Sequence, residues 1–223
     1  MADDVKRPVA AALLCAVALG LLTLLVYGSA GFRELDAETF VRLSSHRESR
    51  PGEWAEALAL MADPIPLLLL LLAAGGIGLA RHRPRDALAA VVVVAGANLT
   101  TQLMKAFLAH PRAQVLLGGS GYHPVGFPSG HTTAAFSIGV AFAFVLPREL
   151  VPLTLALGLA YGAAVGCAVV VIAWHFPSDA VGALLVVATW GFAALAGVRA
   201  VSPPKSRAAE RGGLSPPGAL PSR

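Results

Sequence analysis

The chain has 223 residues, of which 56% are hydrophobic and only 13% are charged, and its mean hydropathy is +0.69. A soluble domain carries roughly twice that share of charged residues, and the composition also excludes a disordered chain and a coiled coil. We therefore expect an all-α membrane protein, a polytopic helical bundle, because a bilayer solvates apolar side chains directly. The net charge of +4 comes from Lys and Arg scattered between apolar runs, which favours a role in topology and argues against a nucleic-acid partner.

Six apolar runs predict six membrane-spanning helices. The first covers residues 9–32 and is longer than a typical signal-peptide core, although the small residues at 28–30 leave a cleavable signal as an alternative. The other five cover residues 65–80, 87–104, 129–147, 151–174 and 180–198. An even number of spans places both termini on one side of the membrane.

Two segments lie outside these runs. Residues 33–61 mix charged and apolar side chains, which is typical of an amphipathic element at the extracytoplasmic membrane surface. Residues 199–223 are rich in Pro, Gly and Ser and have too few apolar side chains to offset the entropy of ordering. We therefore expect one membrane domain over residues 1–198, followed by a disordered cytoplasmic tail.

The positive charges indicate which side of the membrane is cytoplasmic. Eleven of the 17 Lys and Arg residues fall on the side of the two termini: Lys6, Arg7, Arg81, Arg83, Arg85, Arg148, Arg199, Lys205, Arg207, Arg211 and Arg223. We expect a multi-pass protein of the cell membrane with both termini in the cytoplasm. The connections at residues 105–131 and 174–179 then lie on the extracytoplasmic side.

These two connections concentrate ionisable residues, namely Lys105, His110, Arg112, His123, His131, His175 and Asp179. Ionisable groups at the ends of apolar helices are costly to hold without a partner or a task, so their convergence predicts a functional site. The polar residues near the end of the third run have a different expected role, because such side chains often form hydrogen bonds between helices. They are Asn98, Thr100, Thr101 and Gln102.

The tetrapeptide from Pro128 to His131 stands where a connection meets the fourth run. Ser129 is a favoured helix cap, and Gly130 permits close approach to the backbone. The first-turn amides, at the positive end of the helix dipole, attract anions. The tetrapeptide therefore predicts an anion site, with a plain capped helix start as the alternative.

His175 and Asp179 stand four residues apart between the fifth and sixth runs, and Pro177 suits the first turn of the last helix. An Asp at this distance can accept a hydrogen bond from one ring nitrogen of His175. That bond would fix the tautomer and leave the other nitrogen as a nucleophile or base. A capping Asp beside an interfacial His is the alternative.

Lys105 and Arg112 place two cations in one connection, where they suit phosphate oxygens or, alternatively, extend toward lipid headgroups. Phosphoryl transfer requires cations for the equatorial oxygens, an in-line nucleophile and an acid for the departing oxygen. The three segments together can supply all of these. No Asp/Glu cluster of the metal-binding type accompanies them in the sequence, so no metal or cofactor is expected.

In order and spacing, these residues resemble the type 2 phosphatidic acid phosphatase family of membrane phosphatases. The family pattern is Lys-x6-Arg-Pro, Pro-Ser-Gly-His and Ser-Arg-x5-His-x3-Asp, and the resemblance covers residues 105–179. It implies a phosphate-binding role for Lys105, Arg112, Ser129 and Gly130. It also implies that His175 is a nucleophile that forms a phosphohistidine, that Asp179 orients it, and that His131 protonates the leaving group.

Two positions depart from this pattern. Ala113 replaces the Pro of the first motif, and Ala168 with Val169 replaces the Ser-Arg pair of the third, so one phosphate-binding guanidinium is absent. Losing such a donor lowers a rate by about a hundredfold to a thousandfold. The resemblance implies a lipid phosphate substrate, of polyprenyl or phosphatidate type, among membrane lipids. A low-activity member that binds phosphate or headgroups, and a six-span transporter or scaffold, remain alternatives, and the sequence leaves the oligomeric state open.

Overall fold

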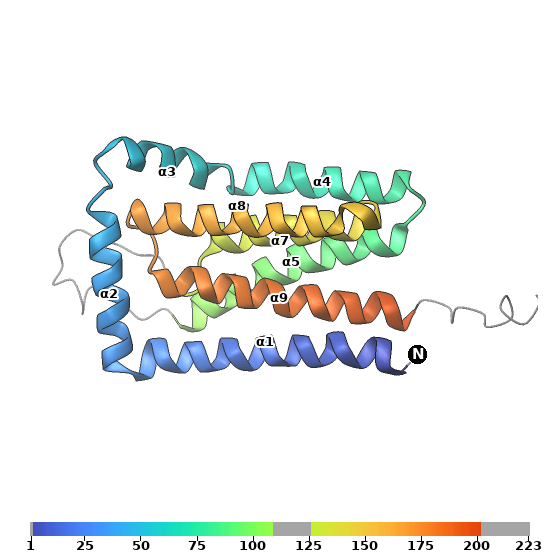
Figure 1. Cartoon of the computed structure of the whole chain (residues 1–223), viewed down its shortest axis with the longest axis horizontal. Coiled ribbons are helices and arrows are strands. Elements are labelled where there is room, and N and C mark those ends of the chain that lie inside the picture. Colours follow the sequence, from blue (N-terminus) through green and yellow to red (C-terminus); the bar gives the residue numbers. More distant parts are fainter. Residues whose placement is uncertain (1, 109–125, 202–223) are drawn as a thin grey trace, which may run out of the picture.

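The computed structural model describes residues 2–108 and 126–201, and over these ranges the chain is helical and contains no strand. The elements are α1 (Ala2–Gly28), α2 (Ala30–Ser44), α3 (Arg50–Leu60), α4 (Pro64–Ala80), α5 (Pro84–Phe107), α7 (Gly130–Val145), the short 3-10 helix η1 (Arg148–Leu150), α8 (Val151–Val171) and α9 (Pro177–Ala200). The long helices run side by side along one axis, and α2 lies across one end of the bundle (Figure 1).

Four of the described helices are long and apolar enough to cross a membrane, namely α1, α5, α9 and the stretch from Arg148 to Val171 that contains α8. The pair α3 and α4, bent by 49°, makes a fifth candidate span. The remaining predicted span corresponds to α7, whose 16 residues extend about 24 Å against a hydrocarbon core of about 30 Å. The predicted all-helical membrane bundle is confirmed, whereas the count of six spans stays a prediction.

The sequence analysis expected the first apolar run to form one helix, but the structure divides it between α1 and α2. The helix breaks at Ser29, which has an extended backbone and accepts a hydrogen bond from the Phe32 backbone N–H at 3.3 Å, so that it caps α2. Hydropathy could not reveal this break because apolar residues continue on both sides of it. The segment at 33–61 forms the rest of α2 and all of α3, and α9 extends to Ala200, two residues beyond the predicted end.

Helix α7 is the centre of the bundle and contacts α4, α5, α8 and α9. Small residues let its neighbours approach closely: a Cβ on Gly139 would lie 2.5 Å from the Cα of Gly158 on α8. Three of the four polar residues of α5 do join helices. Thr101 and Thr133 hydroxyls lie 3.0 Å apart, Trp190 donates to Thr100 at 3.0 Å, and Asn98 donates to Ser137 at 3.4 Å.

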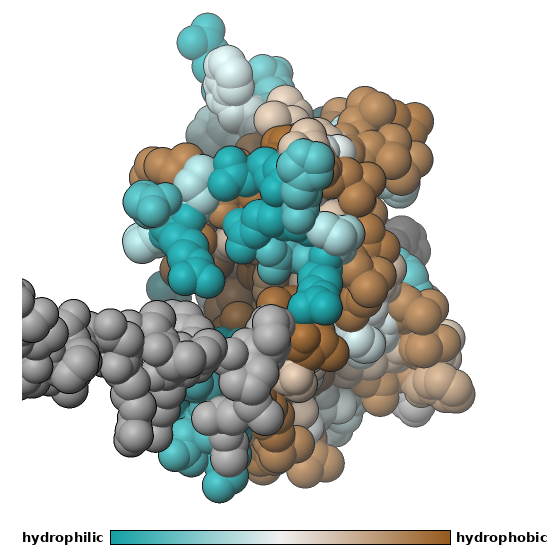
Figure 2. Space-filling model, turned by 90° about the vertical axis from the view of Figure 1, so that its right-hand side faces the viewer, coloured by the Kyte–Doolittle hydropathy of each residue, from teal (hydrophilic) through white to brown (hydrophobic). Residues whose placement is uncertain are grey.

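The two ends of the bundle differ in their chemistry. Figure 2 looks onto the end where α4 meets α5 and α9 finishes, and hydrophilic side chains gather there. Arg83 forms an ion pair with Asp86 at 2.7 Å, and Arg85 donates to the Val201 carbonyl at 2.9 Å. The starts of α7 and α9 lie at the opposite end (Figure 1). The histidines of the second and third motifs therefore share one end of the molecule.

Candidate active site

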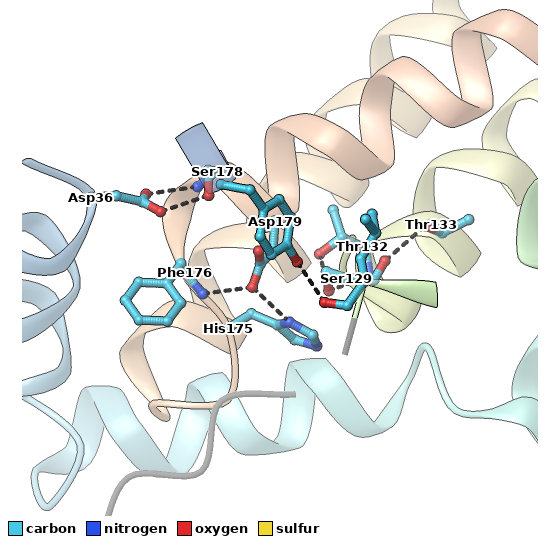
Figure 3. Close-up of polar contacts among 10 residues, drawn as sticks. Asp36, Ser129, Thr132, Thr133, His175, Phe176, Ser178 and Asp179 are labelled. Atoms are coloured by element: carbon cyan, nitrogen blue, oxygen red, sulfur yellow. Dashed lines mark hydrogen bonds and ion pairs between the residues drawn. The ribbon is translucent and has the colours of Figure 1, made fainter. Parts of the chain in front are cut away.

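His175 and Asp179 form a buried pair at the start of α9 (Figure 3). The Nδ1 of His175 lies 3.1 Å from Oδ2 of Asp179, and each side chain is only 2% exposed. A carboxylate can only accept, so the geometry places a proton on Nδ1 and leaves a lone pair on Nε2. The Asp179 carboxylate also accepts from the Phe176 backbone N–H at 3.0 Å. Asp179 thus holds both the ring and the turn that carries it.

The tight turn after α8 buries His175. The carbonyl of Val169 accepts hydrogen bonds from the backbone N–H groups of Trp174 and His175, at 2.9 and 3.1 Å. Ala173 adopts a left-handed φ of 64°, which reverses the chain, and Pro177 then begins α9 in its first turn. Local sequence signals thus fix the spacing between the imidazole and the helix that carries its carboxylate.

Burial lowers the pKa of His175 below its ordinary value, because desolvation disfavours the charged ring. The hydrogen bond and charge of Asp179 oppose this effect, whereas the charges of Lys105 and His131 act in the same direction as burial. The direction of the shift keeps His175 neutral at neutral pH. A neutral imidazole with a free Nε2 is the form that can attack phosphorus.

The start of α7 is tied to the start of α9. Ser129 caps α7 and accepts hydrogen bonds from the backbone N–H and the hydroxyl of Thr132, at 3.3 and 2.9 Å. The Ser129 backbone N–H donates to the Asp179 carbonyl at 3.0 Å (Figure 3). Ser129 is fully buried, and its side-chain oxygen accepts both of these bonds within the first turn of α7. The amides of the first turn of α7 are thereby positioned beside the His175 and Asp179 pair.

His131, in the first turn of α7, has a carboxylate partner that the sequence analysis did not predict. Its Nε2 lies 3.0 Å from Oδ1 of Asp63, which precedes α4, and its ring lies 5.2 Å from the ring of Trp174. The His131 side chain is 26% exposed, in contrast to the buried His175. No local signal could identify Asp63, because it stands 68 residues from His131.

Lys105 points from the last turn of α5 toward the start of α7. A Cβ built on Gly130 would lie 3.2 Å from Lys105 Nζ and 3.7 Å from Gln102 Nε2. Gln102 therefore accompanies Lys105 over the start of α7, whereas the sequence analysis expected it only to form hydrogen bonds between helices. Its position one turn before Lys105 was the available signal, since residues i and i+3 share a helix face. Arg112, like His110 and His123, lies outside the described residues.

Within residues 2–108 and 126–201, no group of three or more His, Cys, Asp or Glu side chains is arranged to hold a metal ion. The two cysteines, Cys15 and Cys167, are not joined in a disulfide.

Residues 86–202, slightly more than half of the chain, match the model of the PAP2 superfamily. The chain belongs to this superfamily. No protein of curated function matches it significantly in sequence. Its fold is similar to the crystal structure of the first transmembrane PAP2 type phosphatidylglycerolphosphate phosphatase from Bacillus subtilis, with a TM-score of 0.72. The two share 17% identity, and the match covers 88% of this chain and 99% of the other.

The superfamily match confirms the predicted family, and the structural match confirms a membrane fold. The matched range begins near the start of α5, so α1 to α4 lie outside it, as does Asp63, which precedes α4. At the third-motif position of the missing guanidinium, Val169 is fully buried in a cluster with Ala135, Val165 and other small apolar residues. This position is therefore part of the apolar core among the described residues.

Proposed function

We propose that this PAP2 protein is a membrane lipid phosphatase that hydrolyses a phosphomonoester or pyrophosphate of an amphiphilic lipid. The superfamily match supports a membrane phosphatase in general. The observation that carries the specific proposal is the buried His175 and Asp179 pair, hydrogen-bonded through Nδ1 and placed beside the start of α7. That arrangement leaves a nucleophilic nitrogen next to backbone amides that favour an anion.

The reaction proceeds in two steps. In the first, Nε2 of His175 attacks phosphorus, the bond from phosphorus to the lipid oxygen breaks, and His131 gives a proton to that oxygen. In the second, His131 takes a proton from water as the water attacks phosphorus, and the bond from nitrogen to phosphorus breaks. Throughout both steps, Asp179 accepts the hydrogen bond from Nδ1–H of His175 and stabilises the positive charge on the phosphorylated ring.

The phosphate is held by donors from two helices. Lys105 Nζ from α5 supplies a positive charge, Gln102 adds a neutral donor, and the amides of Gly130 and His131 begin α7. Arg112 is proposed as a second cation, following the first motif. The proposal assigns no role to a metal ion or cofactor, because protein donors meet the phosphate charge.

A substrate with a lipid tail fits the position of the site at one end of apolar helices, beside the transverse helix α2 (Figure 1). The phosphate would lie at the membrane boundary while the tail stays among the helices or in lipid. Polyprenyl and phosphatidate types both meet this requirement. We place the site on the extracytoplasmic face, following the distribution of Lys and Arg.

The test is phosphate release from lipid phosphates by the purified full-length protein in lipid–detergent micelles. We expect His175→Ala to abolish release and to lose an acid-labile phosphoryl adduct that the parent forms with labelled substrate. His46→Ala, an exposed histidine in the turn after α2, is the matched control and should match the parent. Equal release by His175→Ala and the parent would overturn the proposal.

The burial of Val169 favours one second candidate, a phosphate-binding member with little turnover, because no guanidinium occupies that position. This candidate predicts inorganic phosphate binding by calorimetry, weakened by Lys105→Ala, without measurable hydrolysis of any lipid phosphate. Turnover that depends on His175 would exclude it.

A further inference from the structure

Helix α2 makes two buried contacts with the segment that carries the proposed nucleophile, although it lies outside the matched residues 86–202. Asp36 is 7% exposed, and both its carboxylate oxygens engage Ser178 of α9. Oδ1 accepts from the Ser178 backbone N–H at 3.0 Å and Oδ2 accepts from the Ser178 hydroxyl at 2.6 Å (Figure 3). One turn later, Phe40 packs on Phe176 with ring centres 4.8 Å apart.

The contact with Asp36 supplies a cap that α9 cannot make for itself. Phe176 occupies the N-cap position, where a side-chain oxygen normally accepts from the second or third residue of the helix. A phenyl ring has no such oxygen, and Asp36 fills this role from another helix by accepting from Ser178, the second residue of α9. Its negative charge also stands at the positive end of the α9 dipole.

This cap acts on the nucleophile through very few bonds. Ser178 directly precedes Asp179, and Asp179 binds both the His175 ring and the Phe176 backbone N–H. If the first turn of α9 frays or rotates, the carboxylate of Asp179 moves and the aim of His175 Nε2 changes. A displacement of about 1 Å at a reacting group can cost about a hundredfold in rate.

We propose that Asp36 is a positioning residue, which caps α9 from α2 and thereby fixes the geometry of the His175 and Asp179 pair. The catalytic consequence rests on the proposed function, whereas the effect on the ring of His175 does not. Asp36 touches neither substrate nor reacting atoms in this role. The transverse helix α2 thus becomes part of the active-site framework.

The test compares Asp36→Ala, Asp36→Asn and Ser178→Ala with the matched control Glu38→Ala, an exposed acidic residue of the same helix. We expect Asp36→Ala to lower kcat by about 10-fold to 100-fold with KM within about twofold of the parent. Asp36→Asn keeps one acceptor and Ser178→Ala keeps the backbone donor, so kcat should fall less in these two variants than in Asp36→Ala. Glu38→Ala should match the parent.

The second readout is the tautomer of the His175 ring, from nitrogen chemical shifts assigned with His175→Gln. Asp36→Ala should raise the population of the His175 tautomer that is protonated on Nε2, whereas Glu38→Ala should leave the tautomer population unchanged. A parental kcat together with a parental tautomer in Asp36→Ala overturns the positioning role. If Asp36→Ala fails to fold, the same comparison is made with Asp36→Asn and Ser178→Ala. If the parent hydrolyses no lipid phosphate, the proposed function fails, and the tautomer comparison alone decides the role of Asp36.

Discussion

At the scale of single residues, His175 is subject to two opposing influences. Its burial removes water from the ring and lowers its pKa, while the hydrogen bond to Asp179 favours the protonated ring. The balance keeps the ring neutral, and the same hydrogen bond selects the tautomer with a free Nε2. The proposed nucleophile therefore needs no base to remove its proton before attack.

The lowered pKa of His175 predicts where activity is lost in acid. Protonation of Nε2 removes the nucleophilic lone pair, and it requires a pH below the ordinary histidine value of about 6.5. We expect the acidic limb of kcat/KM that belongs to His175 to have its midpoint below that value. A ring-carbon NMR titration of His175, assigned with His175→Gln, measures the same event directly. A midpoint above the ordinary value would contradict the argument that burial dominates.

The position of Gln102 beside Lys105 predicts that its amide contributes to phosphate binding. Its amide and the Lys105 ammonium both face Gly130, so Gln102→Leu removes one donor while keeping a side chain of similar size. A hydrogen bond to a charged group is worth about 1.5 to 3 kcal/mol, so kcat/KM should fall by about 10-fold to 100-fold. Leu103→Ala, at a half-exposed neighbouring position, is the control. An unchanged Ki for inorganic phosphate in Gln102→Leu would place its amide outside the phosphate site.

The sequence could predict those site residues that belong to short motifs, because spacing along a helix or turn decides their geometry. The bond between His175 and Asp179 follows from a separation of four residues. Asp36 and Asp63 could not be predicted, because their partners stand 142 and 68 residues away and only the packing of α2 and α4 brings them together. Gln102 was expected only to form hydrogen bonds between helices, because its polarity alone does not show which face of α5 it occupies.

At the scale of elements, local signals predicted helix starts better than helix ends. Pro177 begins α9 in its first turn, and Ser129 caps α7 through its own side chain. The break at Ser29, where the side chain caps α2, was missed because it lies within a continuous apolar run. The fifth run was also predicted too long, since α8 ends at Val171 before the turn that buries His175.

Close helix contacts predict opposite effects for two glycine substitutions. A Cβ at Gly139 would meet the α8 backbone at 2.5 Å, so Gly139→Ala must push α7 and α8 apart and destabilise the bundle. At Gly76 in α4, nothing lies within 4 Å of such an atom, so Gly76→Ala should stabilise its helix by up to about 1 kcal/mol. Thermal unfolding in detergent should rank Gly76→Ala at or above the parent and Gly139→Ala below both. The reverse order would show that α7 and α8 do not meet at these glycines.

At the scale of the whole molecule, the polar residues divide between two ends. Helices α5 to α9 make up the matched PAP2 region, but the N-terminal helices add Asp63 beside His131 and Asp36 beside Ser178. The candidate site therefore depends on both halves of the chain. The hydrophilic end seen in Figure 2 includes Arg83 and Arg85 and lies opposite the starts of α7 and α9 (Figure 1). This is the arrangement expected if positive charge marks the cytoplasmic side.

This division predicts the sidedness of two exposed turns. Ser45 follows α2 at the end that holds the candidate site, and Arg81 follows α4 at the other end. In a chain with Cys15→Ala and Cys167→Ala, a membrane-impermeant maleimide should label Ser45→Cys on intact cells and Arg81→Cys only after permeabilisation. The reason is that Lys and Arg near span ends are retained in the cytoplasm. Labelling in the opposite order would place the site on the cytoplasmic face, and labelling of both from one side would mean that the helices between them do not cross the membrane.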